Sequence, residues 1–211
     1  GFFGWTQESQ YEKEMAGAKE TYGPIFAKYA QQDIVTVSKD AEAKAIGQRL
    51  FLNYCSSCHA SDAGGAPGFP SLKDKDWLWG GSPDAIKKTI LDGRQAMMPA
   101  WKTVIGNDGV SKVAAYVISL SGRSANPAQV TAGKSLFNAN CAACHMTTGM
   151  GNQAMGAPNL TDKVWLYGNS LGAIKKTIAD GRHGVMPSHR DFLGEDKVHL
   201  LTAYIYSLSA N

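Results

Sequence analysis

One unit of sequence occurs twice in this chain, and the repeat constrains the fold more than any other feature. The segment AIKKTILDGR at 85–94 returns as AIKKTIADGR at 173–182, with nine of ten residues identical. The motif CSSCH at 55–59 returns as CAACH at 141–145. A sequence written twice in this way predicts two copies of one structural unit.

The spacing between the copies predicts the domain boundaries. The offset is 86 residues up to the cysteines and 88 residues after the histidines, so the second copy carries two extra loop residues. We expect one domain at 46–122 and a second at 130–211, joined by a linker at 123–129. Residues 1–45 precede the repeat as an N-terminal extension.

Each copy is expected to be helical, which places the chain in the all-α class. Apolar residues recur at helical spacing over 41–54 and 130–140, and both segments lead into the cysteine motif. A helix beginning at Pro83 is expected to end at Gly93, and Ser170 and Gly181 bracket its second copy. A loop should follow each of these glycines, and the last helices are expected at 111–120 and 197–208.

The four cysteines predict covalent attachment of haem. Cys55 and Cys58 precede His59, and Cys141 and Cys144 precede His145. C-x-x-C-H is the attachment signature of c-type haem. Two thiols one helical turn apart reach two vinyl groups of one porphyrin, and the following imidazole reaches the iron. We therefore expect two covalently attached haem c groups, with iron bound by His59 and His145.

Two other uses of paired cysteines fit less well. A thioredoxin-like redox pair requires a βαβ setting, and no strand pattern surrounds either motif. A zinc site usually separates its two ligand pairs by about 12–20 residues, whereas 83 positions separate Cys58 from Cys141.

The expected sixth ligands are Met98 and Met186. The loops DGRQAMMP and DGRHGVMP align these two methionines, and each stands directly before a proline. Proline restricts the preceding residue to extended backbone, which allows its side chain to turn inward. Met97 is expected to be a packing residue instead. His59 is the only histidine of the first domain, so bis-histidine ligation is excluded there.

Some competing ligands stay open in the second domain. His183, His189 and His199 are expected at the surface or in packing, with ligation as the alternative. Met146, Met150 and Met155 could also compete, although none has a counterpart in the first copy.

Several recurring residues are candidates for supporting roles. Pro70 and Pro158 could offer the carbonyl that accepts the second N–H of each ligating imidazole. Gly47 and Phe51 are expected to lie where the first helix crosses Tyr116. Gly133 and Phe137 are expected to lie in the same way against Tyr204. The first helix of each domain would then pack against its last helix. The recurring pairs Trp77 and Trp165, and Arg94 and Arg182, fit haem propionate binding or, equally well, core tryptophans and solvated arginines.

Composition and ligand chemistry narrow the function. Hydrophobic residues make up 44% and charged residues 18% of the 211 residues, as in folded soluble proteins. The net charge of +3 is too small to indicate nucleic-acid binding, and we expect no membrane span or leader within the printed residues, because no stretch has either pattern. His/Met ligation leaves no open position on iron, which favours electron transfer over substrate chemistry.

Each half resembles a small class I cytochrome c domain, and the whole chain is similar to the dihaem subunit III of cbb(3)-type cytochrome c oxidases. The segments that carry the likeness are YGPIFAKYA (22–30), KDWLWGGSPDAIKKTILDGRQAMMPAW (75–101) and WLYGNSLGAIKKTIADGRHGVMPSH (165–189). The resemblance implies a non-catalytic electron-transfer subunit that accepts electrons from a donor c-type cytochrome. It implies that the electrons pass to monohaem and haem–copper subunits.

The resemblance also implies a location at the periplasmic face of the bacterial inner membrane, held by an N-terminal anchor that precedes this portion. Residues 6–45 are then expected to be partly helical and to lie on partner subunits, or else to form a loose tether. Two alternatives remain: a soluble two-haem shuttle cytochrome, and a dihaem peroxidase-type enzyme, which requires an accessible iron.

Overall fold

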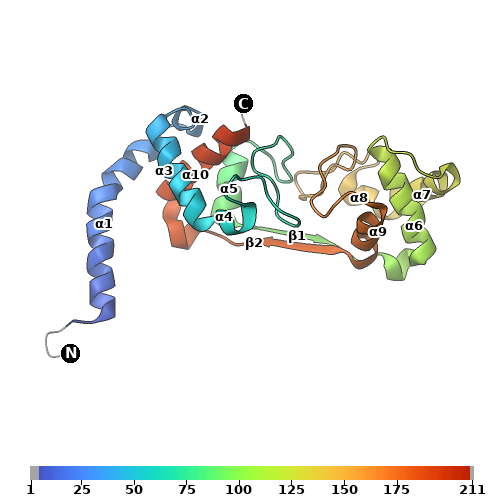
Figure 1. Cartoon of the computed structure of the whole chain (residues 1–211), viewed down its shortest axis with the longest axis horizontal. Helices are drawn as coiled ribbons and strands as arrows, with labels where there is room; N and C mark the ends of the chain where they lie inside the picture. The colour runs from blue at the N-terminus through green and yellow to red at the C-terminus, as the bar shows by residue number, and fades with distance from the viewer. Residues whose placement is uncertain (1–4, 210–211) are drawn as a thin grey trace.

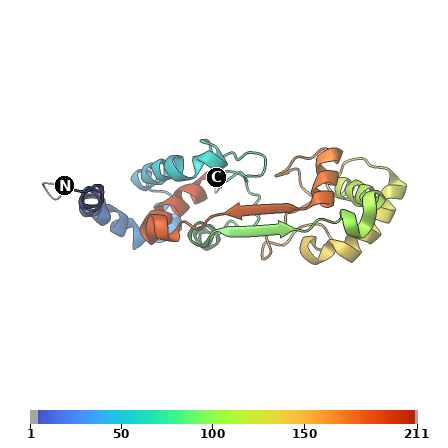
Figure 2. The same cartoon turned by 90° about the horizontal axis from the view of Figure 1, so that it is seen from below.

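The computed structural model describes residues 5–209, which form an elongated, mainly helical molecule with one small sheet (Figure 1). Two helical bodies lie at either end of a two-stranded ribbon, and a long N-terminal helix projects from one of them (Figures 1 and 2). The elements in chain order are α1 (Gln7–Ala30), α2 (Ile34–Val37), α3 (Ala41–Tyr54), α4 (Ser56–His59), α5 (Pro83–Asp92), β1 (Arg94–Met98), α6 (Lys102–Leu120), α7 (Pro127–Asn140), α8 (Ala142–His145), α9 (Leu171–Asp180), β2 (Arg182–Met186) and α10 (Arg190–Ser209).

The expected helices form, with local signals that explain their limits. Asp40 caps α3 by accepting a hydrogen bond from the backbone N–H of Ala43, and Asn126 caps α7. Ser82 caps α5, which has Pro83 at its first position. The prediction of a mainly helical chain with two cytochrome c-like domains is confirmed, whereas the segments after Gly93 and Gly181 form strands rather than loops.

The two strands exchange the last helix of each half. After α5 the chain crosses along β1, so that α6 packs on α7 and α9 of the second half. After α9 it crosses back along β2, so that α10 packs on α3 and α5. A five-residue strand spans about 16 Å, which is enough to carry the chain between the bodies. We define the first unit as α3, α4, α5 and α10, and the second unit as α6, α7, α8 and α9.

Close helix crossings confirm this exchange and correct the expected pairing. Phe51 packs against Tyr204, with ring centroids 5.7 Å apart, and Phe137 packs against Tyr116 at 5.2 Å. A Cβ on Gly47 would lie 2.6 Å from the carbonyl oxygen of Leu200 in α10. The predicted crossings of 47 and 51 with Tyr116, and of 133 and 137 with Tyr204, are therefore wrong, because each first helix meets the last helix of the other copy.

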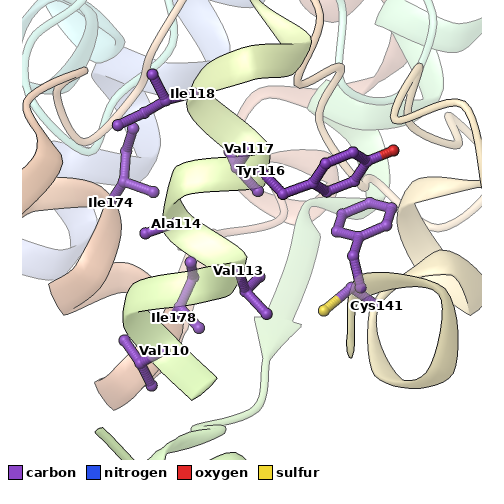
Figure 3. Close-up of a cluster of buried hydrophobic side chains, with 10 residues drawn as sticks. Val110, Val113, Ala114, Tyr116, Val117, Ile118, Cys141, Ile174 and Ile178 are labelled. Carbon is purple, nitrogen blue, oxygen red and sulfur yellow. The ribbon is translucent and has the colours of Figure 1, made fainter. Parts of the chain in front are cut away.

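Each unit has its own apolar core. The core of the second unit joins α6, α7 and α9, as Figure 3 shows. Its buried residues are Val110, Val113, Ala114, Tyr116, Val117, Ile118, Phe137, Cys141, Ile174 and Ile178. The core of the first unit joins Phe51, Ile86 and Ile90 to Val198, Leu201 and Ile205 of α10. Neither core is complete without residues from both sequence repeats.

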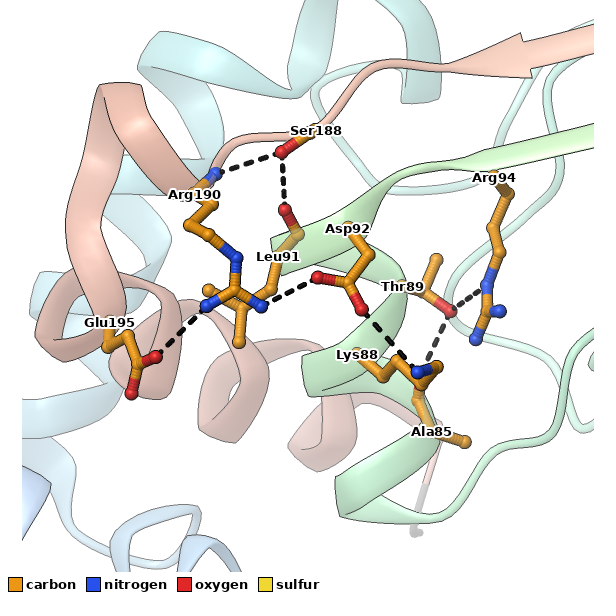
Figure 4. Close-up of polar contacts among 9 residues, drawn as sticks. All are labelled: Ala85, Lys88, Thr89, Leu91, Asp92, Arg94, Ser188, Arg190 and Glu195. Carbon is orange, nitrogen blue, oxygen red and sulfur yellow. Dashed lines mark hydrogen bonds and ion pairs between the residues drawn. The ribbon is translucent and has the colours of Figure 1, made fainter.

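The connection into α10 is fixed by a polar cluster with Arg190 at its centre (Figure 4). The Arg190 guanidinium forms ion pairs with Asp92 of α5 at 2.6 Å and with Glu195 at 3.0 Å. The Ser188 hydroxyl donates to the carbonyl oxygen of Leu91, and the His189 N–H donates to that of Ile90 at 3.0 Å. The matching positions ahead of α6 hold Ala100 and Lys102, so this Arg190 cluster belongs to the first unit alone.

The N-terminal extension is partly helical, as expected, and its end is folded onto the first unit. Tyr29 is buried, and its hydroxyl donates to Glu42 at 2.8 Å and contacts Asp40 at 3.1 Å. Burial and these two carboxylates raise the pKa of Tyr29. Tyr29, Ile34 and Val37 share a core with Leu200 of α10. The first two thirds of α1 extend away from the body (Figure 1).

Candidate haem sites

The cysteine motif has the same geometry in both units. Cys55 ends α3 and begins the short helix α4, whose backbone brings the N–H of His59 to 3.0 Å from the Cys55 carbonyl oxygen. Cys141 and His145 repeat this arrangement at 3.0 Å. None of the four thiols is in a disulfide. Burial raises the pKa of Cys55 and of Cys141 to about 11, so both thiols are protonated at neutral pH.

The two imidazoles are buried, oriented and neutral. His59 and His145 are each 8% exposed. Nδ1 of His59 lies 2.9 Å from the carbonyl oxygen of Pro70, and Nδ1 of His145 lies 3.1 Å from that of Pro158. Because a carbonyl only accepts, each Nδ1 carries the proton and each Nε2 has a free lone pair. Burial is the largest cause that lowers both pKa values. The predicted acceptor role of the two prolines is confirmed.

The helix exchange decides which methionine packs in the same unit as which cysteine motif. Met186 packs against the core of the first unit together with Cys55, and Met98 packs against the core of the second unit, which contains Cys141. Each methionine thus lies in the unit whose cysteine motif comes from the other repeat. The exclusion of bis-histidine ligation in the first domain assumed a contiguous fold, and that premise is wrong because α10 brings His199 into the first unit.

The ribbon explains why one methionine of each strand turns inward. In β1, Arg94, Ala96 and Met98 are half-buried, and the two residues between them are exposed. This alternation is the period of a strand. Met97 is 80% exposed, so its predicted packing role is wrong, because the loop expected there is a strand that points Met97 outward.

The other sulfur and imidazole candidates differ in their surroundings. His189, three residues after Met186, is half-buried, and its Nδ1 has no hydrogen-bond partner among residues 5–209. Met146, Met150 and Met155 are exposed on the loop after α8. His183 is exposed on the outer face of β2. His199 is buried in α10, and Nε2 of His199 has no hydrogen-bond partner among residues 5–209.

The recurring tryptophans and arginines separate into two roles. Trp77 packs against the core of the first unit and Trp165 against that of the second. The arginines stack on aromatic rings that the sequence analysis did not single out: the Arg94 guanidinium carbon lies 4.7 Å from the centroid of Trp79, and that of Arg182 lies 4.2 Å from Tyr167. The recurrence of an aromatic residue in WLW and WLY was the available signal.

The loops that orient the histidines lie against each other. A cleft of about 400 Å³ is lined by Pro70 of the first unit and by Pro158 and Trp165 of the second. The Gly68 N–H donates to the Leu166 carbonyl oxygen at 2.9 Å across this junction. The two histidine loops therefore border one shared cleft.

The residues present fit haem c. In each unit, two thiols that are in no disulfide follow the first helix, an imidazole with a free Nε2 is buried after them, and a methionine from the ribbon packs against the same core. The fold and these sites define a cytochrome c-type protein with two such units. The chain matches the family model "Cytochrome C oxidase, cbb3-type, subunit III" at residues 42–117 and 128–205. The protein belongs to this family: it is an electron-transfer subunit of the oxidase and not its catalytic subunit.

Curated relatives agree over almost the whole chain. The protein is 43% identical over 210 residues to the Cbb3-type cytochrome c oxidase subunit CcoP of Rubrivivax gelatinosus, covering 99% of this chain and 69% of that protein. It is 40% identical to the subunit FixP of Bradyrhizobium diazoefficiens, covering 99% and 77%. It is 34% identical to CcoP of Rhodobacter capsulatus, covering 99% and 78%. Among residues 5–209, no helix has the length and hydropathy that a bilayer crossing requires.

Proposed function

We propose that each unit holds one covalently attached haem c and that the axial pairs cross between the repeats. Cys55 and Cys58 attach the first haem, with His59 and Met186 as its axial ligands. Cys141 and Cys144 attach the second haem, with His145 and Met98. One observation supports this assignment above all others: Met186 lies in the unit of Cys55, and Met98 in the unit of Cys141.

The haem groups supply a reversible one-electron change at iron. The chain holds each imidazole by the carbonyl oxygen of Pro70 or Pro158, and the thioether of Met186 or Met98 would hold the haem iron from the other side. Such closed sites carry electrons and do not bind oxygen or peroxide. Residues 94 and 98 are about 13 Å apart at about 3.3 Å per residue, and Arg94 pairs directly with Met186. Along the ribbon, the backbones of the two capping methionines are therefore about 13 Å apart.

The family supports an inference about the partners. We infer that the subunit lies at the periplasmic face of the bacterial inner membrane, where it accepts electrons from a donor c-type cytochrome. It passes them to the monohaem and haem–copper subunits of the oxidase. The exposed part of α1 carries Tyr11, Met15 and Tyr22 and is the segment that we assign to contact with partner subunits.

The experiment that tests the sites uses intact holoprotein. Mass spectrometry should find two tethered haems per chain. Met98→Ala and Met186→Ala should each remove one of two methionine–iron charge-transfer bands, whereas Met97→Ala should remove neither because that side chain is exposed. Loss of a band in Met97→Ala would overturn the ligand assignment, and a native high-spin haem would favour the peroxidase alternative.

Nuclear magnetic resonance can test the crossing itself. The methionine methyl signal that Met98→Ala removes should show nuclear Overhauser contacts to the haem attached at Cys141 and Cys144. Contacts to the haem at Cys55 and Cys58 instead would restore the sequence-order pairing.

A further inference from the structure

The two extra residues of the second copy lie in one tight turn of its histidine loop. Isolated backbone bridges close this turn in both loops, between Ala66 and Phe69 in the first and between Asn152 and Ala157 in the second. The first bridge encloses residues 67–68, whereas the second encloses residues 153–156. The backbone before and after the turn follows the same course in both copies, so the insertion is confined to 153–156.

The inserted turn contacts the first repeat. The Gln153 side chain donates from Nε2 to the carbonyl oxygen of Trp77 at 2.9 Å. Gly156, at the other end of the turn, is buried, and a Cβ at this position would collide with the ring of Trp79. Both partners belong to the first repeat, so the turn adds a hydrogen bond and a packing contact between the two units.

The first histidine loop makes the reciprocal contacts with the second repeat. Gly68 holds the place that Gly156 holds in the second loop. A ring carbon of Tyr167 lies 3.6 Å from the Cβ position of Gly68, and the Gly68 N–H donates to the Leu166 carbonyl oxygen at 2.9 Å. The Gly156 N–H is directed instead to the Gln153 carbonyl oxygen, at 3.4 Å, within its own turn. The side chain of Gln153 therefore supplies the cross-unit hydrogen bond that the backbone supplies in the first loop.

Each of these glycines lies two residues before the proline whose carbonyl oxygen holds a histidine. The Pro70 carbonyl accepts from His59, and the Pro158 carbonyl accepts from His145. A movement of one unit against the other would therefore move these carbonyl groups and the imidazoles that they hold. Tryptophan and tyrosine rings suit such a contact, because they are large and rigid and lose little conformational entropy on packing.

We infer that Gln153, Trp79 and Tyr167 are positioning residues, which hold the two haem sites at a fixed separation for electron transfer between them. The inference rests on the proposed haem sites. The transfer moves one electron, so one iron is oxidised and the other is reduced, and no proton or covalent bond changes. Its rate falls steeply when the separation increases or when packed atoms between the two sites are lost.

Two substitutions should slow this transfer. Gln153→Ala removes the cross-unit hydrogen bond, and Gly156→Ala places a methyl group against the Trp79 ring, so each should lower the rate severalfold. Both haem potentials should keep their wild-type values, because neither change alters a charge or a proposed ligand. Gln129→Ala, at an exposed site on α7, is the control for the first variant. Gly122→Ala is the control for the second, because Gly122 also has a positive φ but has open space at its Cβ position.

Gln153→Glu tests the hydrogen bond through its pH dependence. An ionised carboxylate has no proton to donate to the Trp77 carbonyl oxygen, whereas a protonated carboxyl group does. The pKa of an exposed glutamate is about 4.3, and the facing carbonyl favours the protonated form. The rate should therefore be low at neutral pH and should approach the wild-type rate, measured at the same pH, in mild acid. A rate that stays low in acid while the wild-type rate is unchanged would overturn the role of the hydrogen bond.

Pulse radiolysis of the oxidised holoprotein measures the rate, as the concentration-independent phase that follows reduction of the first haem. Hydrogen exchange is a second readout, because the Gly68 N–H donates across the junction and should exchange faster in Gln153→Ala. A lower urea midpoint with an unchanged rate in this variant would show a merely structural contact and overturn the inference. A change in the two potentials that accounts for the slower rate would overturn it too.

Two further results separate the possible failures. Absence of tethered haem from the wild-type protein would refute the proposed function. Two attached haems that exchange electrons at one rate in the wild type, Gln153→Ala and Gly156→Ala would refute this inference alone. Gln153 is exposed, so its two variants decide the question even where Gly156→Ala does not fold.

Discussion

Phe51 in the first helix of the first repeat packs against Tyr204 in the last helix of the second, with ring centroids 5.7 Å apart. The tyrosine at the equivalent place in its own repeat, Tyr116, packs instead on Phe137. Both contacts lie where the first and last helices of a unit cross. The repeats are therefore neighbours in sequence but are interleaved in space.

Shortening Tyr204 should loosen the first unit and not the second. Tyr204→Ala removes a ring that packs against the core of α3 and α5, and loss of a large side chain at such a site costs about 2–4 kcal/mol. Hydrogen exchange should rise in 41–54 and remain unchanged in 127–140. Tyr116→Ala should give the reverse pattern. Faster exchange of 127–140 in Tyr204→Ala would contradict the exchange of helices.

A methyl group at Gly133 should destabilise the protein. Its Cβ would collide with the carbonyl oxygen of Lys112 in α6, and overpacking of this kind costs about 1–3 kcal/mol. Gly17→Ala is the control, because nothing lies within 4 Å of that position in α1. Urea denaturation should show a lower midpoint for Gly133→Ala only. Equal midpoints for the two variants would contradict the close crossing.

The ion pairs of Arg190 should hold the start of α10 on α5, and they should be stronger at low salt than at high salt. Arg190→Gln removes the partner that lowers the pKa of Asp92, and exposed ion pairs weaken as ionic strength rises. The amide of His189, which donates to Ile90, should exchange faster in the variant. Lys176→Gln breaks a different exposed pair, on α9, and should leave that amide unchanged. Equal effects of both substitutions would refute a local role for Arg190.

Burial of His199 should make the protein less stable in acid. Desolvation, followed by the charge of Lys87, lowers its pKa, while Asp33 and Asp196 oppose the shift. The pKa of a histidine in the unfolded chain is about 6.5. Between that value and the lower folded pKa, the unfolded state binds more protons. The contribution of neutral His199 to the free energy of unfolding is therefore complete above about pH 6.5. It is lost as pH falls from there through the folded pKa.

His199→Gln should remove this contribution and flatten the dependence of the urea midpoint on pH. His183→Gln replaces an exposed imidazole on β2 and should preserve the wild-type slope. An unchanged slope in His199→Gln would show that other groups cause the acid sensitivity.

The chemistry of the sites was predictable because it depends on short local patterns. Cys55, Cys58 and His59 are fixed by spacing, and Pro70 was found because it recurs at a matched position. The pairing of helices was not predictable, since Gly47, Phe51 and Tyr204 have identical counterparts at 133, 137 and 116. Pairing the first helix with the last helix of its own repeat or of the other repeat satisfies the same sequence pattern.

The residues that distinguish the two pairings lie outside the repeated motifs. Ser188 and Arg190, in place of Ala100 and Lys102, are specific to the connection into α10. Met97 is exposed because side chains alternate between the two faces of β1. The sequence did not indicate this alternation, because the segment before Pro99 was expected to be a loop.

The interleaved arrangement has a consequence for biosynthesis. As the chain leaves the ribosome, Cys55 and Cys58 emerge long before 190–209, which supply the helix that completes their core. The half translated first is thus the half that closes last. Until then the first unit lacks part of its core, and a haem attached early at Cys55 and Cys58 would lack the thioether of Met186 that we propose as its ligand.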